Sequence, residues 1–154
     1  MQRSTTAGWH PRPVTRYRMS VGDRDVAGVE TGLRAALYRF NVETTGLDDG
    51  ELLVVELLDD AGERVAGLFG WTWGGTGFVD LLHVDDGHRG RGLGSRLLAT
   101  AEGEARRRGC RQVVLATHTF QAPAFYAARG YVEVGRVEGY PAGHAQVHLV
   151  KQLA

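Results

Sequence analysis

The sequence of 154 residues lacks several features that define large classes of proteins. It has a single cysteine, Cys110, so the chain cannot form an internal disulfide or a cysteine-rich zinc site. Lysine plus arginine equals aspartate plus glutamate at 18 each, so no overall positive charge favours nucleic acid. No apolar run approaches the roughly 20 residues of a membrane helix, and no apolar signal stretch opens the chain. We therefore expect a cytoplasmic protein that binds neither nucleic acid nor membrane.

The length and the hydrophobic content of 43% suit one domain with one core. Residues 1–15 are rich in Ser, Thr, Gly and Pro without apolar periodicity, which predicts a flexible N-terminal extension with Trp9 as a docking point. Residues 16–154 are predicted to form the single domain. Cys110 is expected to be a buried structural side chain rather than a nucleophile.

Helix and strand patterns alternate along the chain. Apolar residues recur at steps of three and four from Val26 to Phe40, which predicts a helix that ends before the loop at 44–50. Further helices are expected at residues 95–108 and 123–129. Turn residues separate short apolar runs, which predict strands at residues 16–20, 52–58, 64–73, 78–84, 112–117, 131–137 and 146–152. The early strands read as an antiparallel meander.

Glycines crowd into the segment between the strand at 78–84 and the following helix. Gly90, Gly92 and Gly94 let the backbone turn tightly with its N–H groups inward, which is typical of an anion-binding loop. On glycine content alone, a flexible turn that leads into a helix explains the loop equally well. A P-loop needs Lys followed by Ser or Thr, and the chain has Ser95 and Arg96 there. Ser95 also occupies the place of the third glycine of a dinucleotide fingerprint.

Two motifs in the second half of the chain resemble those of the GCN5-related N-acetyltransferase (GNAT) superfamily. The first is Gln or Arg, two residues, Gly, one residue, then Gly or Ala. The matching positions are Arg89, Gly92 and Gly94 in this motif and Ala122, Phe125, Tyr126, Gly130 and Tyr131 in the second. Thr119 departs from the usual Asn of the second motif. The resemblance covers roughly residue 16 to the C-terminus, and within the superfamily the chain is similar to a small bacterial subgroup. The resemblance implies an α/β fold with a mixed, mostly antiparallel central sheet and flanking helices.

The resemblance implies an N-acetyltransferase that moves the acetyl group of acetyl-CoA directly to a primary amine, without an acyl-enzyme. The two substrates would meet where the strands around Leu82 and Leu115 splay apart. The glycine loop and helix N-terminus would hold the pyrophosphate, and the strand before them the pantetheine arm. The expected CoA-binding residues are Leu82, His83, Val84, Arg89, Gly90, Arg91, Gly92, Leu93, Gly94, Ser95, Thr119, Ala122 and Phe125.

Acetyl transfer requires a group that accepts the amine proton and a group that protonates the departing thiolate. Tyr126 matches the tyrosine that serves as general acid in many relatives, with packing on a strand edge as the alternative. Asp80 is predicted to lie in phase with Leu82 and Val84, where desolvation would raise its pKa, or else to be a solvated carboxylate. His83 would then face the opposite side and is the second candidate for the base.

Other conspicuous residues have simpler explanations. Trp71 and Trp73 face one side of a strand and either wall an acceptor pocket or cover a core or dimer face. The arginine run at 106–108 is expected to be a solvated helix end. No metal is expected, because three histidines lack ligand spacing, namely His118, His144 and His148.

Two other functions compete with catalysis. A CoA-binding regulatory module that has lost catalysis would keep the loop without turnover, and a nucleotide-binding or structural module is disfavoured by the missing P-loop lysine. The acceptor is expected to be a small-molecule or peptide amine, and exposed sheet edges make a homodimer one option for assembly.

Overall fold

The structure is a computed structural model that describes residues 18–22 and 25–153. The contacts within the chain divide it into two units, with the division between Tyr38 and Arg39. The predicted extension at residues 1–15, with Trp9, lies outside the described residues. Of the strand expected at 16–20, the described residues 18–20 have no regular structure. Among the described helices, none is long and apolar enough to cross a membrane.

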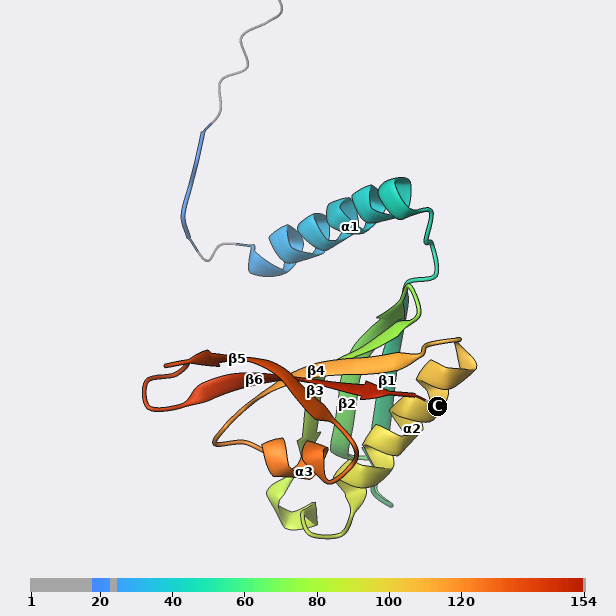
Figure 1. Cartoon of the computed structure of the whole chain (residues 1–154), viewed down its shortest axis with the longest axis vertical. Helices are drawn as coiled ribbons and strands as arrows, with labels where there is room; N and C mark the ends of the chain where they lie inside the picture. Colours follow the sequence, from blue (N-terminus) through green and yellow to red (C-terminus); the bar gives the residue numbers. More distant parts are fainter. Residues whose placement is uncertain (1–17, 23–24, 154) are drawn as a thin grey trace, which may run out of the picture. The chain divides into compact units, whose positions relative to one another are not determined.

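The first helix, α1, spans Val26–Thr45 (Figure 1). The predicted helix is confirmed and continues past Asn41. Its last turn is held by the hydroxyls of Thr44 and Thr45, which donate to the carbonyls of Phe40 and Asn41 over 2.8 and 2.7 Å. The helix ends at Gly46, whose φ of +74° places it in the left-handed region that glycine adopts without strain.

Six strands form one sheet in the order β1-β2-β3-β4-β6-β5. The strands are β1 (Glu51–Leu58), β2 (Arg64–Trp73), β3 (Thr76–Val84), β4 (Gln112–His118), β5 (Val132–Glu138) and β6 (Ala145–Gln152). The first three form the predicted antiparallel meander, and β4 pairs antiparallel with β6 and β6 with β5. Only β3 and β4 are parallel neighbours. The predicted mixed, mostly antiparallel α/β fold is confirmed.

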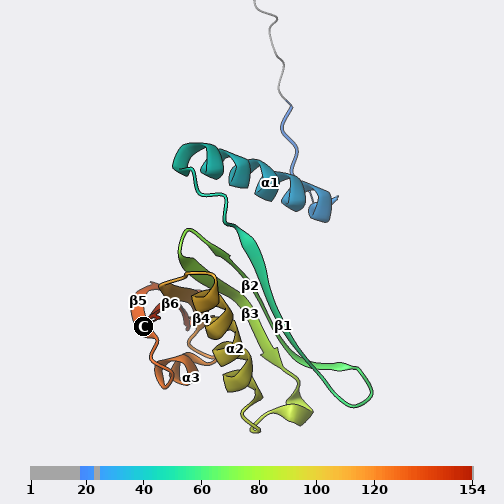
Figure 2. The same cartoon turned by 90° about the vertical axis from the view of Figure 1, so that its right-hand side faces the viewer.

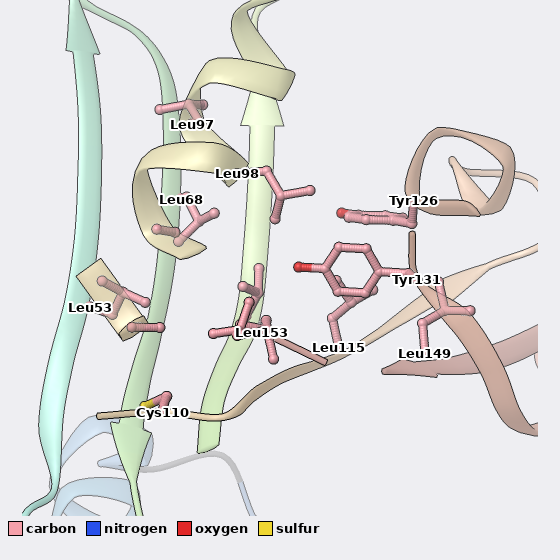
Figure 3. Close-up of a cluster of buried hydrophobic side chains, with 14 of the residues drawn as sticks. Leu53, Leu68, Leu97, Leu98, Cys110, Leu115, Tyr126, Tyr131, Leu149 and Leu153 are labelled. Carbon is pink, nitrogen blue, oxygen red and sulfur yellow. The ribbon is translucent and has the colours of Figure 1, made fainter. Parts of the chain in front are cut away.

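Helix α2 (Leu93–Arg107) covers one face of the sheet across β1, β2 and β3 (Figure 2). Its apolar face, predicted from the spacing of its leucines and alanines, is buried at Leu97, Leu98 and Ala101. Figure 3 shows this core, which Cys110 joins at its edge. Burial raises the pKa of the Cys110 thiol, and a protonated, enclosed thiol is a poor nucleophile, as expected of a structural cysteine.

The last turn of α2 is tied to the sheet through Arg108. The side chain of Arg108 is only 14% exposed, and it donates to the carbonyl of Leu52 over 2.9 Å and to the hydroxyl of Thr72 over 3.2 Å. Its Nε also donates to Glu104 over 2.7 Å. The prediction of a solvated arginine run is therefore wrong at Arg108, because this residue faces the carbonyls of β1 instead of water.

A buried polar network joins α2 to the C-terminal strands. Glu102 is 5% exposed and lies 2.6 Å from the ammonium of Lys151 on β6. Its other carboxylate oxygen accepts a hydrogen bond from the Tyr131 hydroxyl over 3.1 Å. Burial and the adjacent carboxylate raise the pKa of Tyr131 far above its ordinary value. The network fixes α2 against the part of the sheet that follows β4.

Candidate active site

Strands β3 and β4 pair over only part of their length. Their parallel pairing runs from Thr76 opposite Gln112 to Val79 opposite Leu115 and then stops. Beyond that point β3 continues along β2, and β4 continues along β6. The strands therefore separate after Val79 and Leu115, close to the splay that the sequence predicts around Leu82 and Leu115.

A β-bulge lies at the start of the splay. Leu81 pairs with Phe69 and Val79 pairs with Gly70, which leaves Asp80 without a partner on β2. The close approach requires glycine on β2, since a Cβ at Gly70 would lie within bonding distance of the carbonyl oxygen of Phe78.

The bulge also changes which residues of β3 share a face. Val79 belongs to the core, and Leu82 and Val84 pack against it, whereas the three other residues of this segment are exposed, namely Asp80, Leu81 and His83. The inward positions thus shift by one at the bulge. The prediction that Asp80 lies in phase with Leu82 and opposite His83 is therefore wrong, because it assumed a regular strand.

A cavity of about 760 Å³ occupies the splay. Its walls come from the separated parts of β3 and β4, the glycine loop, the N-terminus of α2 and the short helix α3 (Pro123–Ala127). It brings together most of the predicted site residues, namely Asp80, Leu82, His83, Val84, Arg89, Gly90, Gly92, Leu93, Gly94, Ser95, Ala122, Phe125 and Tyr126. Arg91 and Thr119 are outside this lining.

The glycine loop delivers the N-terminus of α2 to the cavity. Gly92 caps the helix in the left-handed conformation, at a φ of 75°, and the first intrahelical bond runs from the Arg96 N–H to the Gly92 carbonyl over 3.1 Å. The N–H groups of the preceding turn have no such partner, which is the geometry that binds anions at helix N-termini. Arg89 supports the loop itself, since its Nε donates to the carbonyl of Val84 over 2.9 Å.

Arg129, which the sequence did not single out, lies beside this helix terminus. Its Nε donates to the hydroxyl of Ser95 over 3.1 Å, and its Nη1 donates to the carbonyl of Phe125 over 2.6 Å. The guanidinium carbon lies 3.7 Å from the centroid of the Phe125 ring. The contacts place a fixed positive charge in the cavity wall. In the sequence, the only sign of this role is that Arg129 stands one residue before Gly130 at the end of a helix. Arginines near helix ends are too common for that position to indicate a binding residue.

Residues 25–131 match the Acetyltransferase (GNAT) family. The chain belongs to the GNAT family of acetyltransferases. Blasticidin-S acetyltransferase of Streptomyces morookaense is 46% identical over 98 residues, which cover 61% of this chain and 70% of that protein. Acetyltransferase Atu2258 of Agrobacterium fabrum (strain C58 / ATCC 33970) is 32% identical over 127 residues, 82% of this chain and 93% of that one. The crystal structure of an acetyltransferase from Bacillus cereus ATCC 14579 has a TM-score of 0.72 at 32% identity, covering 89% and 98% of the two chains.

In this acetyltransferase, Tyr126 lies between the core and the cavity. The residue is 8% exposed, and burial raises the pKa of its hydroxyl above the ordinary value. Its ring packs edge-to-face against Phe125 and Tyr131. No residue within 25–153 forms a hydrogen bond with this hydroxyl. Every fully enclosed side-chain oxygen or nitrogen in the same range does have a hydrogen-bond partner, so the Tyr126 oxygen is not fully enclosed. The Tyr126 oxygen therefore keeps access to the cavity, as a phenol that stays protonated near neutral pH.

Two side chains on the outer face of β3 remain candidates for the base of the acetyltransferase. The Asp80 side chain is exposed and forms neither an ion pair nor a hydrogen bond with any residue that the structure describes. His83 is exposed and lies 3.3 Å from the carboxylate of Asp85. Both side chains line the cavity, and a carboxylate beside an imidazole orients the ring and favours its protonated form, so the geometry leaves both as candidates.

The remaining predicted residues are engaged elsewhere. The Thr119 hydroxyl accepts a hydrogen bond from the Ala145 N–H over 3.1 Å, so it anchors β6. Trp71 stacks on Phe78 with ring centroids 4.4 Å apart, and Trp73 donates to the carbonyl of Leu47 over 2.9 Å. Neither tryptophan is among the residues that line the cavity. Across the described residues, no three His, Cys, Asp or Glu side chains are grouped to hold a metal ion.

Proposed function

We propose that this GNAT acetyltransferase moves the acetyl group of acetyl-CoA directly to a primary amine of a small molecule. The observation that carries the proposal is that the separated parts of β3 and β4, the N-terminus of α2 and Tyr126 all line one common cavity. The 46% identity to Blasticidin-S acetyltransferase supports an amine-bearing antibiotic as the first acceptor to test. The cytoplasmic location, the homodimer and the single domain at residues 16–154 stay predictions.

The residues at the α2 end of the cavity fit the diphosphate of acetyl-CoA. The first turn of α2 has no acidic side chain, and Arg129 adds positive charge to its free N–H groups. Glycine at position 94 keeps this surface bare, since a Cβ there would be in van der Waals contact with the Phe125 ring and a longer side chain would extend over the surface. On the side of β3 that β4 leaves, residues 80–84 offer backbone groups to the amides of the pantetheine arm.

The cavity also provides for both protons of the reaction. A primary alkyl amine has a pKa of about 10.4 and arrives protonated at neutral pH. The amine loses a proton to Asp80, to His83 or to water, its nitrogen forms the bond to the acetyl carbon, and the bond from that carbon to sulfur breaks. Tyr126 donates its phenolic proton to the departing thiolate, and the second proton, which the nitrogen loses as the amide forms, passes to solvent, from which the phenolate regains a proton. The cavity thus holds the amine and the thioester together, so that no covalent enzyme intermediate is needed.

The alternative is a module that binds acetyl-CoA without transferring its acetyl group. Two relatives of this chain are named acetyltransferases, and Tyr126 lines the cavity, so turnover is the better-supported function. An assay of free CoA with blasticidin S and a panel of primary amines separates the two. We expect release of CoA and a product heavier by one acetyl group. Acetyl-CoA binding without release of CoA for any amine would establish the silent module instead.

A further inference from the structure

A cluster of four rings lies beside the cavity and reaches its wall through one member, Phe120. We call it the ring cluster, and its members are His118, Phe120, Tyr140 and His144. The His118 ring stacks on Phe120 with centroids 5.2 Å apart and meets Tyr140 edge-on, also at 5.2 Å. Phe120 meets His144 edge-on at 5.0 Å and lines the cavity. Phe120 therefore connects the ring cluster to the cavity that would hold the acceptor.

The ring cluster joins two loops that hydrogen bonds fix to each other. His118 and Phe120 come from the end of β4, and Tyr140 and His144 from the connection between β5 and β6. The Thr119 N–H donates to the carbonyl of Ala145 over 2.9 Å, and the Ala145 N–H donates back to the Thr119 hydroxyl.

Two further hydrogen bonds, one within each loop, fix the loop conformations. The Gln121 side-chain oxygen accepts from the His118 N–H over 2.9 Å, and the Tyr140 N–H donates to the carbonyl of His144 over 3.1 Å. The rings are thus preorganised, so a ligand would not have to order them.

The exposure of these rings separates them from the aromatic core. Phe120 and Tyr140 are each 54% exposed, whereas the core tyrosines Tyr126 and Tyr131 are 8% and 3% exposed. The ring cluster contains no carboxylate, lysine or arginine. Its surfaces are therefore the faces and edges of π-systems together with imidazole nitrogens. The His118 Nδ1 already lies 3.2 Å from the Gln121 side-chain oxygen, so the other ring nitrogens are the ones that would hydrogen bond with the polar edge of a heterocycle.

We propose that the ring cluster binds a planar unsaturated ring carried by the amine acceptor. The inference rests on the proposed function for the identity of the acceptor, and it adds the chemical class that the site selects. Stacking against Phe120 and Tyr140 favours a flat conjugated ring over a saturated one of similar size, because only the former matches the π-quadrupole of these side chains.

The test compares two amines that differ in unsaturation, benzylamine and cyclohexylmethylamine. We expect Phe120→Leu and Tyr140→Leu each to lower kcat/KM for benzylamine about tenfold while changing it little for cyclohexylmethylamine. The KM for acetyl-CoA should stay unchanged. Each variant is compared with the parent protein for the same amine, so the different basicities of the two amines cancel.

Phe78→Leu is the matched control. It makes the same substitution in another stacked pair, with Trp71, outside the cavity lining. It should leave the preference between the two amines unchanged. Equal losses for both amines in the Phe120 and Tyr140 variants, or no loss for either, would overturn the ring-binding inference while acetyl transfer itself stands.

A second measurement covers the outcome in which neither amine is acetylated, which would contradict the proposed function for these acceptors. Protein with isotopically labelled histidine is saturated with CoA and titrated with each amine, and the imidazole NMR signals of His118 and His144 are followed. The variants His118→Gln and His144→Gln assign these signals. Shifts with benzylamine and none with cyclohexylmethylamine support the ring site independently of turnover. Equal shifts, or none, would overturn it.

Discussion

Arg129 donates from Nε to the hydroxyl of Ser95 over 3.1 Å, although 34 residues separate them along the chain. The contact brings the turn after α3 against the N-terminus of α2. It adds a formal positive charge where the free N–H groups of the helix already favour an anion. The end of the cavity that would receive the diphosphate is therefore assembled from two distant segments.

Arg129→Gln should raise the KM for acetyl-CoA about tenfold, the order of one charge-assisted hydrogen bond, and change kcat little at saturation. Initial rates at varied acetyl-CoA measure both constants. Arg136→Gln is the control, because Arg136 is an arginine on β5 that pairs with Glu133 at the surface. An unchanged KM in the Arg129 variant, or an equal rise in the control, would contradict the assignment.

Gly94→Leu should abolish the rise in melting temperature that acetyl-CoA produces, because the new side chain would fill the surface beside Phe125. Gly103→Leu is the control in the same helix, where a Cβ meets no atom within 4 Å. That variant should keep the full shift. Scanning fluorimetry with and without acetyl-CoA measures both shifts. A retained shift in the Gly94 variant would refute the binding of the diphosphate at the N-terminus of α2.

Tyr126→Phe should preserve acetyl-CoA binding and lower kcat by about 10²-fold, the low end of general-acid effects. Since burial raises the pKa of Tyr126, the hydroxyl stays protonated up to and beyond about pH 10, and its contribution should persist to that pH. Tyr131→Phe is the control. It removes the bond to Glu102 and should cost about 1 kcal/mol of stability without lowering kcat. Equal kcat in the parent and Tyr126 variant would make Tyr126 a packing residue.

Asp80→Asn should depress kcat/KM near neutral pH and flatten or displace the acidic limb of its pH profile, because the amide keeps the shape of the side chain but accepts no proton. Acetyl-CoA affinity should change little. His83→Gln serves as the comparison on the same exposed face of β3. If the His83 variant alone loses the limb, His83 is the base, and if neither does, water accepts the proton. An acceptor that does not titrate in this range is required.

Glu102→Gln should lower the free energy of unfolding by about 3 kcal/mol, because it leaves the partly buried ammonium of Lys151 without its anionic partner. Urea denaturation measures the loss. Glu133→Gln is the control, since its ion pair with Arg136 lies at the surface and contributes little. Similar stability of the two variants would show that the buried pair does not hold α2 against β6.

Much of the fold could be predicted because it depends on neighbours in the chain. The stripe from Val26 to Phe40 and the face of α2 around Leu97 are read from spacing, since a helix repeats every 3.6 residues. The glycine loop is equally local. Its turn and the helix start after it require Gly92 in a left-handed conformation, and that requirement is visible in the residue type.

Such local reasoning could not predict on which face of β3 the Asp80 side chain lies. Alternation along a strand gives the facing of each residue only while the pairing is regular, and the bulge at Asp80 depends on how β3 meets Gly70 of β2. Arg108 was misjudged for a related reason. A basic residue in a last helical turn is usually solvated, and only the path of β1 beneath it shows that its guanidinium binds the Leu52 carbonyl.

The sequence by itself determined the order of helices and strands from Val26 onward, the glycine loop before α2 and the place of Tyr126 in a family motif, because each depends on residue type and short spacing. Only the tertiary structure decided that β3 and β4 part after Val79, that Arg129 reaches Ser95, and that the four rings of the ring cluster meet. These contacts join residues far apart in the chain. They follow from strand register and packing, which no local pattern encodes.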